Sequence, residues 1–274
     1  MNHLRELGDL LSREIRGQAT ALSRILSVLQ RGQLGLSKST RPRGSFLLLG
    51  PTGVGKTETV VVATRHLFGP EGLIRFDMSE FQTQDSIRIL LGNGGSEEGQ
   101  LPRVRAARAC GSLLFDEIEK AHPKVLDLFL QLLDAGRLTA ASGEVLDFSG
   151  FYVWLTSNIA SSEIVNLQYS GDATLERHVL AGAQMALRPE LFARIQERIV
   201  FYPLGYDIQL EIARKFLEGE LAFLENKGHR LTVKPEVMGF LVRKGFHPKL
   251  GARPMRDTIE RLVGEAIAAR LLIG

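Results

Sequence analysis

Only one cysteine, Cys110, occurs in the 274 residues of the chain. Because a disulfide needs two thiols, no intrachain disulfide framework exists, and a reducing, cytoplasmic setting is the natural expectation. Cys110 precedes a short apolar run and has no histidine or second cysteine near it in the sequence. We therefore expect a buried structural thiol rather than a nucleophile or a metal ligand.

Long apolar stretches are also missing. No run approaches the ~20 residues that a membrane-spanning helix needs, and the N-terminal segment lacks the apolar core of a signal peptide. The net charge is only +3, and the basic residues are dispersed along the chain. The sequence therefore predicts a cytoplasmic protein without a membrane partner. An ordinary soluble surface is favoured over a nucleic-acid face, although a nucleic-acid partner stays open.

What the sequence does have is a regular alternation of short apolar runs with helical segments. Because each run is almost continuously apolar, it suits a strand that is buried on both faces of a parallel sheet, with helices as the covering layers. The expected strands are 45–50, 73–77, 112–115, 152–156 and 198–201, and the expected helices are 4–31, 56–67, 123–133 and one that begins at 86.

The pattern changes after the fifth strand. The expected elements there are a helix at 207–225, a strand at 230–233, a helix that begins near Pro235 and a helix at about 254–272. The sequence thus predicts an α/β domain over residues 1–203 and a smaller, mainly helical domain over residues 204–274.

A phosphate-binding motif lies between the first expected strand and the helix that follows it. Residues Gly50–Thr57 fit the Walker A pattern G-x-x-x-x-G-K-[ST]. Glycines allow backbone angles that aim successive N–H groups at phosphate oxygens, and the helix N-terminus adds partial positive charge. Lys56 is expected to contact the β- and γ-phosphates of ATP, and the hydroxyl of Thr57 to ligate Mg²⁺. The other expected binding residues of this motif are Pro51, Thr52, Gly53, Val54 and Gly55.

Two adjacent carboxylates end the third expected strand. Ligands of open parallel sheets bind at the carboxyl ends of the strands. Asp116 is therefore a candidate to hold Mg²⁺, and Glu117 a candidate to take a proton from an attacking water. In isolation such a pair would indicate a solvated strand end, but behind a phosphate-binding loop we favour a Walker B motif.

Several longer stretches carry a family resemblance. They are Phe46–Glu58, Asp77–Phe81, Asp116–Pro123 and Leu132–Thr139, with shorter matches at Thr156–Asn158, Arg188–Glu190 and Gly251–Pro254. Over about residues 17–272 the chain resembles the second ATPase domain of the bacterial Clp chaperones. The resemblance implies a three-layer P-loop AAA+ core with a parallel sheet and a small, mainly helical C-terminal lid. It also implies Mg-ATP hydrolysis coupled to protein remodelling or unfolding by a homo-oligomeric, hexameric ring.

The same resemblance gives roles to residues that spacing alone does not single out. It implies that Asn158 is the sensor 1 residue that orients the lytic water, and that Arg253 is the sensor 2 arginine that touches the phosphates from the lid. Ile15, in the segment Ile-Arg-Gly-Gln, matches the part of the family that lines the adenine pocket.

An arginine finger is implied in the same way at Arg194. A guanidinium that stays charged can neutralise the charge that develops on a transferred phosphoryl group in the neighbouring subunit. From spacing alone, Arg188 and Arg198 remain alternatives, and only the resemblance selects Arg194.

The sequence departs from the family pattern in one segment. Clp motors usually carry a Gly-aromatic-Val-Gly loop that grips polypeptide in the central pore, whereas residues 91–101 are shorter and contain no Tyr, Phe or Trp. An aromatic side chain gives apolar, sequence-tolerant grip, which Gly, Asn and Ser do not. An alternative function therefore stays open, namely an ATP-dependent switch or assembly scaffold, with a protein or DNA partner, that does not thread a substrate. Residues 161–181 also lack the Ile-Gly-Phe/Leu-type tripeptide, so docking to a Clp peptidase is not indicated.

Overall fold

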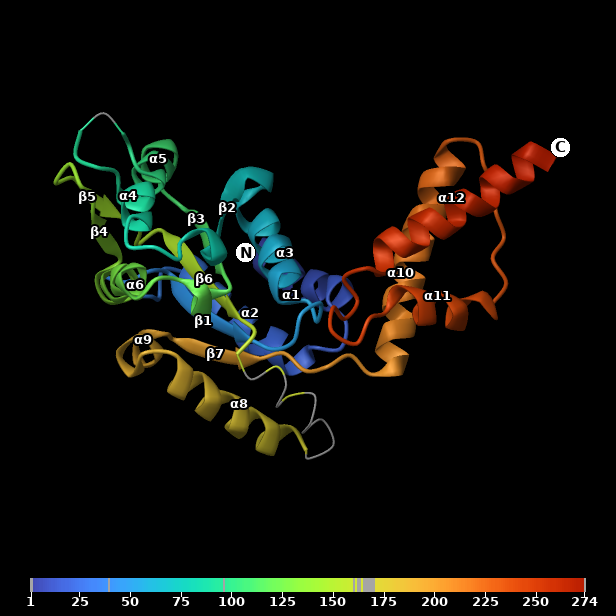
Figure 1. Cartoon of the computed structure of the whole chain (residues 1–274), viewed down its shortest axis with the longest axis horizontal. Helices are drawn as coiled ribbons and strands as arrows, with labels where there is room; N and C mark the ends of the chain where they lie inside the picture. Colours follow the sequence, from blue (N-terminus) through green and yellow to red (C-terminus); the bar gives the residue numbers. More distant parts are fainter. Residues whose placement is uncertain are drawn as a thin grey trace. The chain divides into compact units, whose positions relative to one another are not determined.

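The computed structural model describes residues 2–38, 40–95, 97–159, 161, 164 and 171–273 (Figure 1). The chain forms two compact units. One comprises Met1–Gly50 with Gly55–Phe201, and the other comprises Pro51–Val54 with Tyr202–Gly274. None of the helices within the described part of the chain is long and apolar enough to cross a membrane.

The first unit is built around a five-stranded parallel sheet with the order β2-β3-β6-β1-β7. Its three central strands are buried along their whole length, which explains why their sequences are continuously apolar instead of alternating. All five expected strands are confirmed, and their ends differ from the expected ones by at most one residue. The strands are β1 (Gly44–Leu49), β2 (Leu73–Asp77), β3 (Gly111–Asp116), β6 (Phe151–Ser157) and β7 (Glu197–Val200).

Helices cover both faces of this sheet, so the expected three-layer α/β fold is confirmed (Figure 1). On one face, the Thr64 hydroxyl of α3 donates to Ser112 Oγ of β3 at 2.8 Å. On the other face, the ring of Phe129 from α6 packs edge-on against Phe115 of β3, with 4.6 Å between the ring centroids.

Within the described residues, the α-helices of this unit are α1 (Asn2–Glu14), α2 (Ala19–Gln33), α3 (Lys56–Phe68), α4 (Ser86–Leu91), α5 (Gln100–Ala107), α6 (Pro123–Ala135), α8 (Asp172–Ala186) and α9 (Pro189–Arg194).

The single helix expected over residues 4–31 is wrong, because the structure has two. Helix α1 ends at Glu14 and α2 begins at Ala19, and between them Gly17 has a φ of +73°, a left-handed conformation that interrupts a right-handed helix. Apolar periodicity exists on both sides of the break, so the pattern alone did not reveal it. The break leaves Ile15 in the turn between the two helices.

Two smaller expectations also differ from the structure. Cys110 is exposed rather than buried, because it lies in the bend before β3 and the buried strand begins only at Gly111. The antiparallel hairpin of β4 (Arg137–Thr139) and β5 (Val145–Asp147) was not predicted, since strands this short give no readable alternation.

The second unit has its own helical core. Its helices are α10 (Tyr206–Asn226), α11 (Val237–Gly245) and α12 (Met255–Ile273). The strand expected at 230–233 is wrong: this segment is irregular, and it connects α10 to α11 while Leu231 and Val233 pack on the helical core. An isolated extended segment cannot form a strand without a neighbour to pair with.

Candidate functional site

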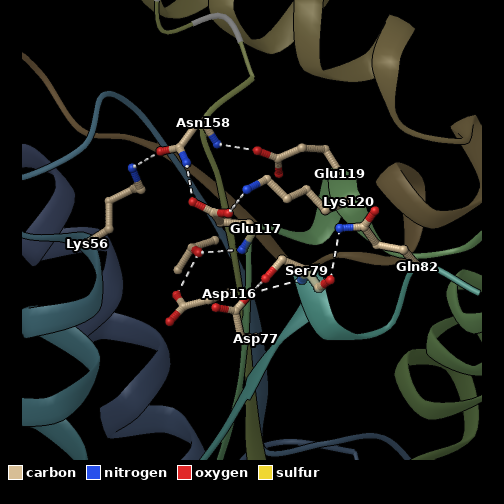
Figure 2. A network of polar contacts seen from close by, with 10 residues as sticks. Lys56, Asp77, Ser79, Gln82, Asp116, Glu117, Glu119, Lys120 and Asn158 are labelled. Carbon is tan, nitrogen blue, oxygen red and sulfur yellow. Dashed lines mark hydrogen bonds and ion pairs between the residues drawn. The ribbon is translucent and has the colours of Figure 1, made fainter. Parts of the chain in front are cut away.

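The polar residues predicted for nucleotide chemistry gather at the carboxyl edge of the parallel sheet. Strand β1 leads into the Walker A loop, β3 ends at Asp116, and its neighbour β6 ends at Ser157. Because parallel strands all point the same way, their carboxyl ends lie along one edge. Figure 2 shows the side chains that meet there.

Lys56 begins helix α3 and points into this cluster (Figure 2). Its Nζ donates to the carbonyl of Gly50 at 2.5 Å and to Asn158 Oδ1 at 3.1 Å, and its side chain is almost fully buried. Burial lowers the pKa of Lys56 from 10.5 to about 8, an effect that nearby carboxylates, first of all Glu119, only partly offset. A bound polyanion would favour the protonated lysine again.

The loop before Lys56 has the backbone that the motif requires. Gly53 and Gly55 have φ angles of +75° and +106°, which side-chain-bearing residues rarely adopt. Gly55 is the N-cap residue of α3 and, as a glycine, places no side chain over the first N–H groups of the helix. A Cβ atom at Gly55 would meet Ile15 Cγ2 at 3.2 Å, which places Ile15 beside the loop. These features fit a phosphate ligand.

Residues Pro51, Thr52, Gly53 and Val54 belong to the second compact unit, as does Arg253. Within that unit the N–H of Ala252 donates to the carbonyl of Gly53 at 3.2 Å. The N–H of Arg253 donates to the carbonyl of Leu250 at 3.2 Å, which closes the turn before α12.

Asp116 is buried and accepts hydrogen bonds from three directions. Oδ1 accepts from the hydroxyl of Thr156 at 2.8 Å and from that of Thr57 at 3.4 Å, and Oδ2 pairs with Arg75 Nε at 2.5 Å. The carboxylate and the Thr57 hydroxyl therefore lie next to each other as hard oxygen donors. This donor set fits Mg²⁺, which prefers oxygen ligands and few protein groups.

Glu117 has a strained backbone and a highly constrained carboxylate. Its φ and ψ are 57° and 52°, and it is the one non-glycine residue with positive φ in the described part of the chain. Oε1 accepts from Asn158 Nδ2 at 3.1 Å, and Oε2 forms an ion pair with Lys120. The backbone N–H of Glu117 donates to Thr156 Oγ1 at 3.1 Å. Such strain costs on the order of 1–3 kcal/mol and is typical of functional positions.

Asn158 connects Lys56 to this carboxylate, since its side-chain oxygen accepts from Lys56 and its side-chain nitrogen donates to Glu117 (Figure 2). Its backbone N–H donates to Glu119 Oε1 at 3.0 Å. The second oxygen of Glu119 is buried and has no hydrogen-bond partner among the described residues. The structure thus brings Lys56, Thr57, Asp116, Glu117 and Asn158 together.

Four side chains of this network were not predicted from the sequence: Arg75, Thr156, Glu119 and Lys120. Thr156 had a usable signal, because it lies at the end of the strand next to Asp116 and therefore at the same sheet edge. The other three differ from ordinary surface charges only through their contacts.

Arg194 lies at the end of α9, and none of its hydrogen bonds or ion pairs in the described structure involves the Lys56–Glu117 cluster. Its Nε pairs with Asp134 of α6, and its Nη1 donates to the carbonyl of Glu190 at 3.0 Å. The two other arginines considered from spacing differ in their contacts: Arg188 pairs with Asp127, and Arg198 lies over the ring of Phe192.

Comparison with known proteins agrees with this geometry. The family model of the AAA domain (Cdc48 subfamily) matches residues 41–198, and the model of the C-terminal, D2-small domain of ClpB protein matches residues 204–274. The chain is 38% identical to chaperone protein ClpB 1 of Synechococcus elongatus, over 100% of this chain and 32% of that protein. It is also 38% identical to the mitochondrial chaperone protein ClpB4 of Arabidopsis thaliana, over 98% of this chain and 29% of that protein.

These relatives are much longer, and the chain spans about a third of their length. The two family models together cover both the sheet-containing part and the helical C-terminal part of the chain. These matches over both parts of the chain show that it belongs to the AAA+ ATPases of the Clp chaperone family.

Proposed function

We propose that the chain binds Mg-ATP at the carboxyl edge of its sheet and hydrolyses it. The observation that carries this proposal is the hydrogen-bonded series Lys56–Asn158–Glu117, which links the phosphate-binding lysine to a carboxylate able to take a proton. Pro51, Thr52, Gly53, Val54, Gly55 and Thr57 complete the phosphate loop in this proposal, and Ile15 lines the adenine site. When bound by Thr57 and Asp116, Mg²⁺ would neutralise charge on the phosphates.

In the reaction, the oxygen of a water attacks the γ-phosphorus while the bond to the β,γ-bridging oxygen breaks, and ADP leaves. Glu117 accepts the proton that the water loses, so the products are ADP and inorganic phosphate. Asn158 orients the carboxylate, and Lys56 balances charge on the phosphates. The left-handed backbone at Glu117 supports this role, since strain of this kind persists only where the surroundings impose it.

The proposed site is completed by two arginines outside the Lys56–Glu117 cluster. Arg194 acts in trans as the finger for the neighbouring subunit, which requires a ring, and a hexamer is the form we propose from the family. Arg253 acts as sensor 2 from a lid that we delimit at residues 204–274, following a core at residues 1–203. An isolated subunit is then a poor ATPase.

ATP turnover in the leading proposal drives remodelling or unfolding of proteins in the cytoplasm, in keeping with the chaperone names of the relatives. Docking to a Clp peptidase is not proposed, because residues 161–181 lack the tripeptide for it. Within that segment, residues 162, 163 and 165–170 lie outside the described residues.

One observation favours a second candidate, a switch or scaffold that does not thread its partner. The loop at the family's pore position is held by hydrogen bonds within itself. Asn93 Oδ1 accepts from the N–H of Gly95 at 2.9 Å, and the backbone N–H of Asn93 donates to the carbonyl of Glu97 at 3.3 Å. The loop ends touch, since a Cβ at Gly99 would meet the nitrogen of Gly92 at 2.3 Å. Nothing aromatic in this loop could grip a chain.

The two candidates differ in what stimulates the ATPase. The rate of the assembled protein should be measured with an unfolded protein such as casein, with duplex DNA and with neither. Stimulation by casein supports the remodeller, whereas stimulation by DNA alone overturns it in favour of the switch. Absence of any ATP binding in the presence of magnesium would refute both.

A further inference from the structure

Arg194 is held within its own chain by an ion pair with Asp134, a residue outside the proposed nucleotide site. Asp134 lies in the last turn of α6, 60 positions before Arg194 in the sequence, and its Oδ2 accepts from Arg194 Nε. Helices α6 and α9 pack against each other around this ion pair. Both side chains are partly exposed, 34% for Arg194 and 41% for Asp134, so the pair lies at the surface rather than in the core.

We infer that Asp134 is a positioning residue for the arginine finger: it fixes the guanidinium of Arg194 so that the outer edge can meet the phosphates of the neighbouring subunit's nucleotide. This inference rests on the proposed trans role of Arg194. Asp134 itself touches no nucleotide in this scheme.

The atoms used in the ion pair show whether Asp134 orients the guanidinium of Arg194 or blocks its access to a ligand. Asp134 takes Nε, and the carbonyl of Glu190 takes one hydrogen of Nη1 at 3.0 Å. Nη2 makes no hydrogen bond within the described residues, so the two terminal nitrogens together keep three N–H groups for a ligand. This end of the guanidinium can bind phosphate oxygens in a bidentate manner. Asp134 therefore fixes the guanidinium through Nε and leaves the terminal nitrogens for a phosphate.

The surroundings of the pair also suit an anion. Arg194 and Asp134 line an open cavity of about 610 Å³ to which Arg137 of β4 also contributes. The charged residues that line this cavity are two arginines and one aspartate, so its lining has a net positive charge. A long side chain loses much rotamer entropy when it is fixed. Since Asp134 fixes the side chain in advance, less of that cost falls on the reaction step.

The test compares two aspartates of the same helix. Asp127 pairs with Arg188 as Asp134 pairs with Arg194, and both pairs join α6 to the α9 region with similar exposure. Asp127→Ala is therefore the matched control for the loss of a surface ion pair. The variants Asp134→Ala, Asp134→Asn, Asp127→Ala and Arg194→Ala should be purified as full chains. Each is then assayed for folding by circular dichroism, for assembly by light scattering, and for kcat and KM with ATP.

We expect Asp134→Ala to lower kcat by about 10-fold to 100-fold, the loss typical of a misplaced catalytic group. KM for ATP and assembly should remain unchanged. Asp134→Asn should recover most of the rate, because its amide oxygen can still accept from Nε. Asp127→Ala should keep kcat within about two-fold of the unmodified chain. The double variant Asp134→Ala/Arg194→Ala should be no slower than Arg194→Ala alone.

Other outcomes overturn the inference in distinguishable ways. If Arg194→Ala loses activity while Asp134→Ala keeps or raises kcat, the finger stands and the positioning role is refuted. If Asp127→Ala is as slow as Asp134→Ala, the effect is one of α6–α9 packing, and the inference fails. If Arg194→Ala keeps its rate, the proposed finger itself is wrong, whatever Asp134 does. If Asp134→Ala does not fold, the test rests on Asp134→Asn, which keeps an oxygen that can accept from Arg194 Nε. If this variant folds and assembles but is as slow as Arg194→Ala, an acceptor for Nε is not enough, and the inference fails.

Discussion

Asn158 donates a hydrogen bond from its side-chain amide to the carboxylate of Glu117 across 3.1 Å. The oxygen of the same amide accepts a hydrogen bond from Lys56, so the Asn158 side chain contacts both the lysine and the carboxylate. A shift of Lys56 toward a bound phosphate would free Asn158 to turn. If Lys56 binds phosphate as proposed, Asn158 links that contact to the orientation of the Glu117 carboxylate.

Glu117→Gln should bind ATP normally but turn it over at least ~10²-fold more slowly, because an amide can accept the hydrogen bond from Asn158 but cannot take up a proton. Nucleotide binding can be followed with a fluorescent ATP analogue, and turnover by phosphate release in a single-turnover experiment. A variant with near-normal phosphate release would remove Glu117 from the role of base.

Thr156→Val should weaken both stability and catalysis. The Thr156 hydroxyl donates to Asp116 and accepts the N–H of Glu117, and valine of similar shape leaves both groups without this partner in a buried site. A loss of about 1–3 kcal/mol in the free energy of unfolding is expected from urea titration. Thr156→Ser, which keeps the hydroxyl, is the control. Equal stability of the valine and serine variants would contradict the expectation.

ATP affinity should fall as the pH rises above 8. The pKa of Lys56 is about 8 in the nucleotide-free chain, and bound phosphates would raise it, so binding takes up a proton in this range. We expect the dissociation constant to increase by roughly 5-fold between pH 8 and pH 9. Titration calorimetry in two buffers of different ionisation enthalpy measures the uptake directly.

The control for this pH dependence is Lys56→Arg, since a guanidinium stays charged throughout. The ATP affinity of this variant should not change between pH 8 and pH 9. If its affinity falls with pH as steeply as that of the unmodified chain, another group causes the effect.

The lowered pKa of Lys56 also affects folding stability. Between pH 8 and 10.5 the unfolded chain holds more protons at this residue than the folded chain, so the contribution of Lys56 to stability rises with pH over that window.

Mixed rings should reveal whether the finger acts in trans. Arg194→Ala and Lys56→Ala should each be inactive alone, the first for want of the finger and the second for want of the phosphate-binding lysine. In a random equal mixture, roughly a quarter of the interfaces pair an intact site with an intact finger. ATPase activity should therefore reappear on mixing. Assembly of both variants, checked by light scattering, is the control, and continued inactivity of an assembled mixture would weaken the trans assignment.

Much of the core fold was accessible from sequence because it depends on local, repetitive signals. Each of the five sheet strands coincides with a short, mainly apolar run, and the Walker A pattern combines glycines with a lysine at fixed spacing. The break at Gly17 and the irregular segment 230–233 could not be read in this way. The first depends on one backbone angle inside a periodic pattern, and the second on the lack of a pairing partner in space.

Some residues of the candidate site could likewise be predicted from local sequence signals, and others could not. Lys56, Asp116 and Glu117 were indicated by residue type and by their place after a strand. Thr156, Arg75 and Lys120 matter through contacts between segments that lie far apart in the sequence, or through side-chain direction, and neither appears in a pattern. The expected burial of Cys110 failed for a related reason, since one residue decides whether a side chain belongs to the strand or to the bend before it.

The left-handed backbone at Glu117 has a genetic consequence. Glycine adopts this conformation without steric cost, so Glu117→Gly should relieve roughly 1–2 kcal/mol of strain while it removes the carboxylate. Loss of activity here would then come without loss of folding stability, and in the proposed ring the inactive subunits would persist and assemble with intact ones. In such a ring, a Glu117→Gly allele would be dominant negative, because its stable product would inactivate assemblies that also contain intact subunits.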